Sequence, residues 1–450
     1  MTQHSATSYE EPVIAVGLLD QCEAVRIHLQ GPYQDLSGHL LPAGEIYVDC
    51  HAGVLGCKGV WNGEARELNL APTHSESCQF SLEATIGINF HWQQRETQSF
   101  RGSLQLLPKP DNRLTVVNRV WLETYLTSVV CSEMKASSPQ EFIKAHAIIS
   151  RSWLLAQLAT RDSADPVDDQ KQKDIEGELI RWTEREAHQD FDVCADDHCQ
   201  RYQGTARINA PGVVAAIRQT RGEVLTYDGR PCDARFSKNC GGIIEEYQTA
   251  WGNMAVPYLI ALRDSHGKDR SPPALVNDRA MRAFLQNPPP AYCDCTDRSV
   301  LRCVLNDYDL ATDGFFRWQV RLPASEATRL VNQKLATDLG RLLNLEPVER
   351  GPSGRLKRLR LVGEQGSLVI GKELEIRRVL SDTHLYSSAF VVDVEGYSQR
   401  PDAFLLTGAG WGHGVGLCQI GAAVMAHQGA GYREILEHYY PGTQVEHPYS

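Results

Sequence analysis

The feature that most constrains this chain is a glycine-dense run at residues 410–421. It holds five glycines over twelve residues, interleaved with Trp411, His413 and Gln419. Ordinary helices and strands disfavour such density, because glycine inside a regular element costs roughly 0.5–1 kcal/mol in conformational entropy. Glycine also accepts positive φ and lets other groups approach the backbone. Two interpretations stay open: a loop that forms a site, and a structural turn that buries Trp411 and carries one incidental histidine.

A long helix is predicted to start near residue 138. Ser138 suits the N-cap, Pro139 the first helical position, and Glu141 completes a capping box. Apolar residues then recur every three or four positions to about residue 159, which predicts one buried face: Phe142, Ala145, Ile149 and Trp153. Glu133 precedes this helix and follows an apolar, strand-like run. A carboxylate at such a junction can serve as a general acid, although a surface glutamate near a helix end is the more common case.

The rest of the sequence predicts a mixed α+β fold. Residues 13–127 alternate between apolar and polar positions and are broken by turn residues, which indicates a β-rich region. We divide the chain into an N-terminal β-rich region, residues 1–99, and a catalytic region, residues 100–450, assembled from distant segments with inserted lobes. Residues 161–190 are predicted to be a charged, solvated insertion or short exposed helices, and residues 288–312 a cysteine-containing excursion.

Composition excludes two classes of partner. The net charge is −11 without a long Lys/Arg block, which argues against nucleic acid. No apolar run reaches the roughly 18 residues that a membrane span needs. Residues 1–12 lack the pattern of a secretory signal peptide.

Cysteine usage indicates free thiols or a metal. Thirteen cysteines cannot all pair in disulfides within one chain. Two thiols and two imidazoles gather within twelve residues and form a candidate zinc site: His188, Cys194, His198 and Cys199. A Cys194–Cys199 disulfide and unlinked thiols are the alternatives. Cys293 and Cys295 are too close in sequence for an ordinary disulfide and have no assigned role.

Three motifs resemble one known family, the stage II sporulation protein D and LytB amidase-enhancer family. They are YLTSVVCSEMKAS at 125–137, RFSKNCGG at 235–242 followed by AWGN at 250–253, and GWGHGVGLCQIGA at 410–422 followed by ILEHYYPGT at 435–443. The sequence departs from the family pattern at Lys135, Ser138 and His146. The resemblance implies a lytic transglycosylase that cuts between N-acetylmuramic acid and N-acetylglucosamine in peptide-free glycan strands and leaves a 1,6-anhydro end.

The resemblance also implies roles for single residues. Glu133 matches the family's catalytic acid, and some members carry zinc at a cluster similar to the one at residues 188–199. A saccharide site needs an aromatic floor and nearby polar groups. The candidate substrate-binding residues that would supply them are Lys144, Arg151, Ser237, Lys238, Trp251, His413 and Gln419.

Two functions from different classes follow. The first is the glycan-cleaving enzyme, and the second is a non-catalytic, wall-binding enhancer of an N-acetylmuramoyl-L-alanine amidase, as LytB-type relatives are described. Peptidoglycan glycan strands, and in the second case an amidase, are the expected partners. The substrate predicts the cell envelope or periplasm, whereas the missing signal pattern leaves the cytoplasm open.

Overall fold

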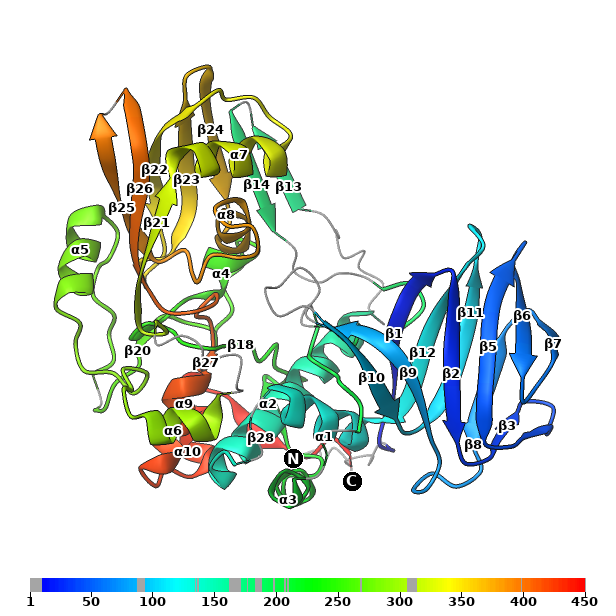
Figure 1. Cartoon of the computed structure of the whole chain (residues 1–450). Coiled ribbons are helices and arrows are strands. Elements are labelled where there is room, and N and C mark those ends of the chain that lie inside the picture. Colours follow the sequence, from blue (N-terminus) through cyan, green and yellow to red (C-terminus); the bar gives the residue numbers. More distant parts are fainter. Residues whose placement is uncertain are drawn as a thin grey trace. The chain divides into compact units, whose positions relative to one another are not determined.

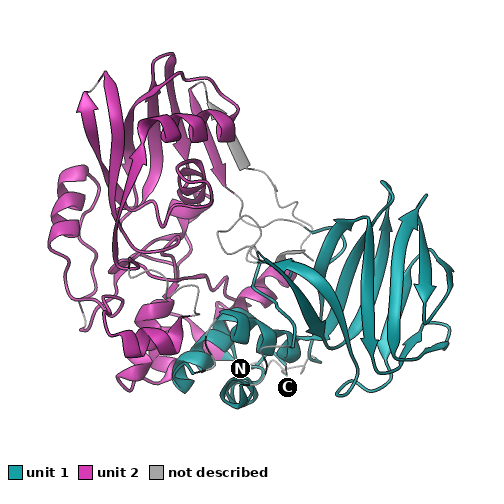
Figure 2. Ribbon diagram, in the orientation of Figure 1, with its two compact units in different colours: residues 1–151, 187–224, 446–450 teal, residues 152–186, 225–445 magenta. Residues whose placement is uncertain are grey.

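The structure is a computed structural model that describes residues 10–86, 94–133, 135, 137–161, 171–175, 177–182, 188–196, 199–205, 208, 210–267, 269–305, 314–397 and 399–449. The chain forms two compact units (Figure 2). Unit 1 comprises residues 1–151, 187–224 and 446–450, and unit 2 comprises residues 152–186 and 225–445. The predicted boundary between residues 99 and 100 falls inside unit 1.

Unit 1 is built on two β-sheets, and most of their strands are labelled in Figure 1. The first has the order β15-β1-β12-β11-β8-β3-β4, with bounds Val193–Cys194, Val13–Cys22, Arg113–Trp121, Ser103–Lys109, Leu68–Pro72, Tyr33–Asp35 and Leu40–Leu41. The second has the order β10-β9-β2-β5-β6-β7, with bounds Gln94–Phe100, Gln79–Ile86, Ala24–Gln30, Gly44–His51, Val54–Gly59 and Gly63–Ala65. The predicted β-rich character of this region is confirmed.

Alternation along the strands explains why the two sheets pack. In β2, Val25, Ile27 and Leu29 are buried, while the residues between them are exposed. Successive side chains of a strand point to opposite faces, so each sheet presents one apolar face. β12 packs against β5 and β11 against β6, which places these faces together.

The helices of unit 1 carry the family-like motif. Strand β12 leads directly into α1 (Leu122–Glu133), which is followed by α2 (Gln140–Arg161) and α3 (Pro211–Gln219); the part of α2 up to Arg151 belongs to unit 1 and the rest to unit 2. The predicted helix after residue 138 is therefore confirmed, and its four predicted core residues, at positions 142, 145, 149 and 153, are buried. The run before Glu133 is a helix and not the predicted strand. Nine of its twelve residues are buried, and an apolar run of this kind shows no periodicity that separates helix from strand.

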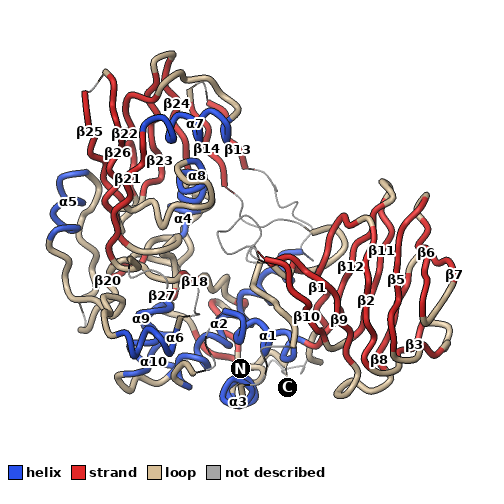
Figure 3. Tube along the Cα trace, viewed as in Figure 1, coloured by secondary structure: helices blue, strands red, loops and turns tan. Residues whose placement is uncertain are grey.

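Unit 2 contains the remaining sheets (Figure 3). The largest has the order β13-β14-β24-β23-β22, with bounds Lys171–Ile175, Glu178–Trp182, Gly366–Gly371, Leu356–Gly363 and Leu342–Arg350. A three-stranded sheet has the order β21-β26-β25, with bounds Arg317–Pro323, Arg400–Ala409 and Phe390–Tyr397. The smaller sheets are β17-β16-β28 (Arg230–Pro231, Val224–Tyr227, Gln444–Glu446), β18-β27 (Phe236–Ser237, Leu417–Cys418) and β19-β20 (Ile243–Ile244, Leu262–Arg263).

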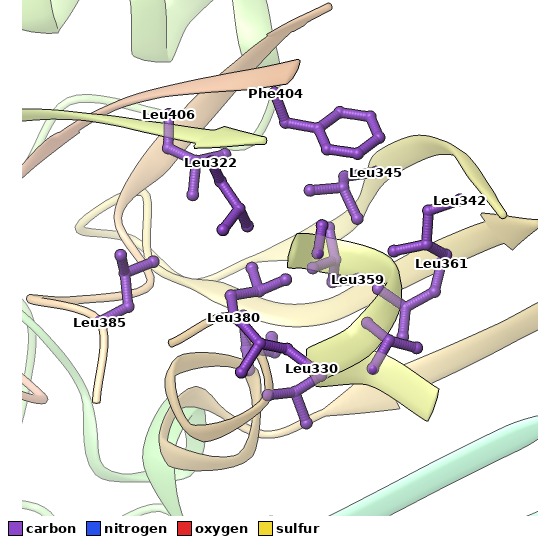
Figure 4. Packing of buried hydrophobic residues seen from close by; sticks show 14 of the residues in the cluster. Leu322, Leu330, Leu342, Leu345, Leu359, Leu361, Leu380, Leu385, Phe404 and Leu406 are labelled. Carbon is purple, nitrogen blue, oxygen red and sulfur yellow. The ribbon is translucent and has the colours of Figure 1, made fainter. Parts of the chain in front are cut away.

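The helices of unit 2 are α4 (Tyr247–Ala250), α5 (Asp278–Gln286), α6 (Arg298–Val304), α7 (Ala324–Leu335), α8 (Glu373–Val379), α9 (Gln419–His427) and α10 (Tyr432–Tyr439). α7 and α8 pack on the larger sheets through a leucine-rich core (Figure 4). Leu330 of α7, Leu359 of β23 and Phe404 of β26 are each at most 1% exposed in this core. Within the described residues, no helix has both the length and the apolar character needed to cross a membrane.

The charged insertion differs from its prediction. Its described part forms a β-hairpin, β13 and β14, and β14 pairs in parallel with β24 of the largest sheet. Leu179 of β14 is 9% exposed and belongs to the leucine-rich core. Leu179 packs into this core while β14 pairs with the edge of β24, so the hairpin extends the sheet. Short exposed helices do not form in this described part.

Candidate functional site

Glu133 is the last residue of α1 and is partly buried. Its position is a helix end ahead of the connection to α2, and not the predicted strand-to-helix junction. The backbone N–H of Arg201 donates a hydrogen bond of 3.2 Å to Glu133 Oε1. A carboxylate held by a backbone donor on a rigid helix has a defined position, which is what a reacting group requires.

The segment that carries Arg201 is itself fixed by aromatic packing. The Tyr125 ring of α1 stacks on Tyr202 at 5.1 Å, and the Tyr125 hydroxyl donates to Gln200 Oε1 at 3.2 Å. The Tyr202 hydroxyl donates to Asn118 Oδ1 of β12 at 2.7 Å. Burial raises the pKa of the Tyr125 and Tyr202 hydroxyls, so both remain neutral donors. α1 and β12 together therefore hold the backbone that binds Glu133.

The predicted zinc ligands lie just before this segment in unit 1. One ligand atom from each of His188, Cys194 and Cys199 lies within 4.8 Å of the others, and all three residues are partly buried. His188 Nε2 is 3.4 Å from Cys199 Sγ, and the Cys194 N–H donates to Cys199 Sγ at 3.5 Å. The fourth candidate, His198, lies outside the described residues. Two thiols and an imidazole are donors that zinc prefers.

Two further predicted residues lie on α2. Lys144 is partly buried, and its ammonium pairs with Glu141 at 2.6 Å. Arg151 is fully buried, and its guanidinium donates to both Glu123 oxygens, at 3.0 and 2.7 Å, and to the Glu223 carbonyl at 2.9 Å. A side chain enclosed in this way does not present itself to a saccharide. Its contacts support a structural role in place of the predicted binding role.

In unit 2 the glycine-dense loop runs along the segment that contains Ser237 and Lys238. β27 pairs in parallel with β18, and isolated bridges join Asn239 to Trp411 and Glu245 to Val415. The structure thus brings together two motifs that are more than 170 residues apart, as the pairing of Ser237 with Cys418 shows.

Arg355 explains why the loop needs its glycines. The guanidinium of Arg355 is fully buried and donates to the carbonyls of Gly412 and Cys240, both at 3.1 Å. Gly410 and Gly414 have φ of +77° and +74°, and a Cβ on Gly414 would lie 2.4 Å from Arg355 Cζ. The loop therefore wraps an internal cation. Of the two interpretations of this run, the structural turn has direct support, and Arg355 is a residue that the sequence analysis missed.

The candidate binding residues beside the loop are mostly enclosed. Trp251 is 9% exposed, and its ring contacts Tyr247 at 5.1 Å, His413 at 4.8 Å and the Arg235 guanidinium at 4.4 Å. Such a ring offers no open face for stacking on a sugar, which corrects the prediction of an aromatic floor.

Exposure separates the other four candidates of unit 2 into two pairs. Ser237 and Gln419 are 7% and 2% exposed, whereas Lys238 and His413 are partly exposed. The first pair is therefore enclosed like Trp251, and the second pair is less enclosed.

Replacing Gly414 by alanine should destabilise unit 2 by about 2–5 kcal/mol, because left-handed φ and a clash with Arg355 add together. The matched control is Gly229→Ala. Gly229 has a similar φ, +72°, but nothing lies within 4 Å of its added Cβ, so only about 1–2 kcal/mol should be lost. Urea unfolding of both variants measures the difference, and equal losses would show that the packing around Arg355 does not constrain the loop.

Two histidines should make unit 2 sensitive to acid. Burial and nearby arginines hold the pKa of His413 well below its ordinary value, and burial together with Arg377 lowers the pKa of His384 to about 4. His413 Nδ1 accepts the Val415 N–H at 3.0 Å, which fits a neutral ring.

The unfolded chain therefore binds more protons than the native state once the pH falls below about 6.5. Stability should be unaffected by these groups above that pH and should fall as the pH approaches 4. Urea midpoints across this range test the expectation, and His384→Gln should flatten part of the slope. A slope that His384→Gln leaves unchanged would contradict it.

Two family models and several known proteins match parts of this chain. The family model described as stage II sporulation protein matches residues 110–227, and that of a domain of unknown function, DUF8618, matches residues 245–416. The chain is 23% identical over 331 residues to stage II sporulation protein D of Bacillus subtilis (strain 168), covering 73% of this chain and 75% of that protein. It is 22% identical over 331 residues to stage II sporulation protein D of Bacillus amyloliquefaciens, again covering 73% of this chain and 75% of that protein.

A third relative carries a different description. The amidase enhancer of Bacillus subtilis (strain 168) is 25% identical over 241 residues, covering 51% of this chain and 32% of that protein. The first family match contains Glu133 and the described part of the His/Cys cluster. Together with the relatives, it shows that the chain carries a stage II sporulation protein domain at residues 110–227 and is similar to stage II sporulation protein D and to an amidase enhancer.

Proposed function

We propose that this chain is a lytic transglycosylase that cuts the bond between N-acetylmuramic acid and N-acetylglucosamine in peptide-free glycan strands. The observation that carries the proposal is Glu133, which by resemblance corresponds to the family's catalytic acid, lies within the family match, and has its carboxylate held on the end of α1 by the N–H of Arg201. The substrate class would place its action in the cell envelope or periplasm.

A single carboxylic acid can perform this reaction. The protonated Glu133 gives its proton to the glycosidic oxygen, and the bond from that oxygen to the anomeric carbon breaks. The resulting carboxylate then accepts the proton of the sugar's own 6-hydroxyl as that oxygen bonds to the anomeric carbon. The product is a 1,6-anhydro end, no water is consumed, and Glu133 returns to its acid form. The two-carboxylate arrangement of most glycoside hydrolases is therefore not required.

The His/Cys cluster supports the position of the acid. His188, Cys194 and Cys199, with His198 as a predicted fourth ligand, would hold a zinc ion in a structural role. Cys199 lies two residues before Arg201, so ligation there would fix the backbone N–H that binds Glu133. Lys144, Lys238 and His413 are partly exposed and remain candidates for contact with the sugar.

The second candidate function is a non-catalytic enhancer of an N-acetylmuramoyl-L-alanine amidase. The similarity to an amidase enhancer over half of this chain favours it.

Purified protein incubated with peptide-free glycan strands, followed by mass spectrometry, separates the two functions. The enzyme predicts anhydro-ended fragments from the protein alone. Intact strands, combined with a higher rate when an amidase acts on whole peptidoglycan in the presence of this protein, would support the enhancer instead.

A further inference from the structure

Unit 2 contains a second cluster of metal-ligand side chains, away in sequence from the His/Cys cluster. Cys240, Asp264, Cys293 and Cys418 are each at most 2% exposed, and one ligand atom from each lies within 4.8 Å of the others. They come from four places: the turn between β18 and β19, the residue after β20, the loop before α6, and the last residue of β27. We propose that these four side chains form a closed, structural zinc site.

The spacing of the ligand atoms suits one tetrahedral ion. Zinc–sulfur bonds of about 2.3 Å place two sulfur ligands about 3.8 Å apart. Cys240 Sγ lies 3.5 Å from Cys293 Sγ and 3.5 Å from Asp264 Oδ2. Three sulfurs and one carboxylate oxygen give zinc four protein ligands, with no position left for water or substrate. A site of that kind stabilises a fold and does not carry out chemistry.

Hydrogen-bond donors surround the proposed ligand atoms, as they do around the ligands of zinc sites. The Tyr439 hydroxyl donates to Asp264 Oδ1 at 2.8 Å, and His438 Nε2 lies 3.3 Å from the same oxygen. The Cys240 backbone N–H donates to Cys418 Sγ at 3.2 Å, and the Cys293 N–H donates to Asp264 Oδ2 at 3.2 Å. Groups of this type orient ligands and stabilise the anionic sulfur and oxygen atoms.

Buried arginines supply the balancing charge. Arg355 donates to the Cys240 carbonyl at 3.1 Å, and Arg317 donates to the adjacent Gly241 carbonyl at 3.0 Å. Among the described residues, Arg355 Nη2 and Arg317 Nε and Nη2 are buried without a hydrogen-bond partner. Three thiolates and one carboxylate outnumber the charge of a divalent ion, so the complex is anionic. That anion adds to the negative charge that Glu245 and Asp294 already place near Arg355 and Arg317.

A disulfide explains the cluster less well. Joining Cys240 to Cys293 would use two of the three thiols and leave Cys418 and the buried carboxylate of Asp264 without a purpose. The Tyr439 hydroxyl and the Cys293 N–H hold the Asp264 carboxylate beside the three sulfurs, where it can serve as the fourth ligand. One zinc ion accounts for all four side chains.

Elemental analysis of the purified full-length protein tests the proposal. A Cys194→Ser/Cys199→Ser variant removes the thiols of the unit 1 cluster and should still carry one zinc per chain. Adding Cys418→Ser should remove that ion. The matched control is Cys295→Ser, because Cys295 is two residues from Cys293 but lies outside the cluster, and this control should leave the zinc content unchanged.

Two further measurements compare wild-type protein with the Cys194→Ser/Cys199→Ser variant. Cobalt reconstitution should give a thiolate-to-cobalt charge-transfer band that decreases, but does not vanish, in Cys194→Ser/Cys199→Ser. Removal of zinc by a chelator should lower the melting temperature. A folded Cys194→Ser/Cys199→Ser variant that holds no metal would overturn the proposal, as would a Cys240–Cys293 disulfide in non-reducing peptide maps of wild type.

Discussion

Replacing Arg151 by methionine is expected to destabilise unit 1 by about 3–5 kcal/mol, because it leaves a buried carboxylate without its cation. The guanidinium of Arg151 is 0% exposed and forms a two-pronged pair with Glu123. Glu123 Oε1 also accepts the Tyr449 hydroxyl at 2.7 Å and the Gly222 N–H at 3.3 Å. The pair therefore ties α1 and α2 to two later segments of the same unit, and its loss affects all of them.

The chain offers a matched control on its surface. Arg26 and Glu45 approach to 2.7 Å, the same distance as Arg151 and Glu123, but their side chains are 67% and 52% exposed. Arg26→Met should cost about 0–1 kcal/mol, because solvent screens an exposed pair. Denaturant unfolding followed by circular dichroism measures both variants. Similar losses for Arg151→Met and Arg26→Met would contradict the structural role assigned to Arg151.

Replacing Glu133 by glutamine is expected to slow glycan cleavage by about 10²–10⁴-fold, the usual contribution of a general acid. Glutamine retains an oxygen that can accept the Arg201 N–H, so the local structure should persist. What it loses is the proton that the glycosidic oxygen needs. The rate of anhydro-sugar release by equal amounts of wild type and variant measures the effect.

Two controls make that result specific. Glu45→Gln removes a carboxylate of the same unit from an exposed pair and should leave the rate unchanged. Unfolding curves of Glu133→Gln should overlay those of wild type. A variant that keeps wild-type activity would show that Glu133 is not the acid, whatever its position.

The sequence pattern was sufficient to predict elements whose apolar residues recur at a regular spacing. The helix after residue 138 has a capping signal and a regular apolar face, and α2 forms there with that face buried. α1 was mistaken for a strand because its apolar residues cover all its sides. The β13–β14 hairpin was missed because β24 pairs with β14 residues that lie 191 positions earlier in the chain.

For the candidate site, too, the sequence identified some residues but not their contacts. Motif similarity selected Glu133, His413 and Trp251, but similarity does not report burial. Trp251 and Arg151 are enclosed by neighbours that are distant in sequence, so their contacts could be known only from the structure. The cluster of Cys240, Asp264, Cys293 and Cys418 has no local spacing to recognise, since Cys240 and Cys418 alone are 178 residues apart.

The most direct test of the account is cleavage of peptide-free glycan strands in ¹⁸O-labelled water. If Glu133 directs attack by the sugar's own 6-hydroxyl, wild type releases 1,6-anhydro fragments that contain no label, and Glu133→Gln releases almost none. Reducing ends that carry ¹⁸O, or anhydro fragments formed equally fast by Glu133→Gln, would contradict it.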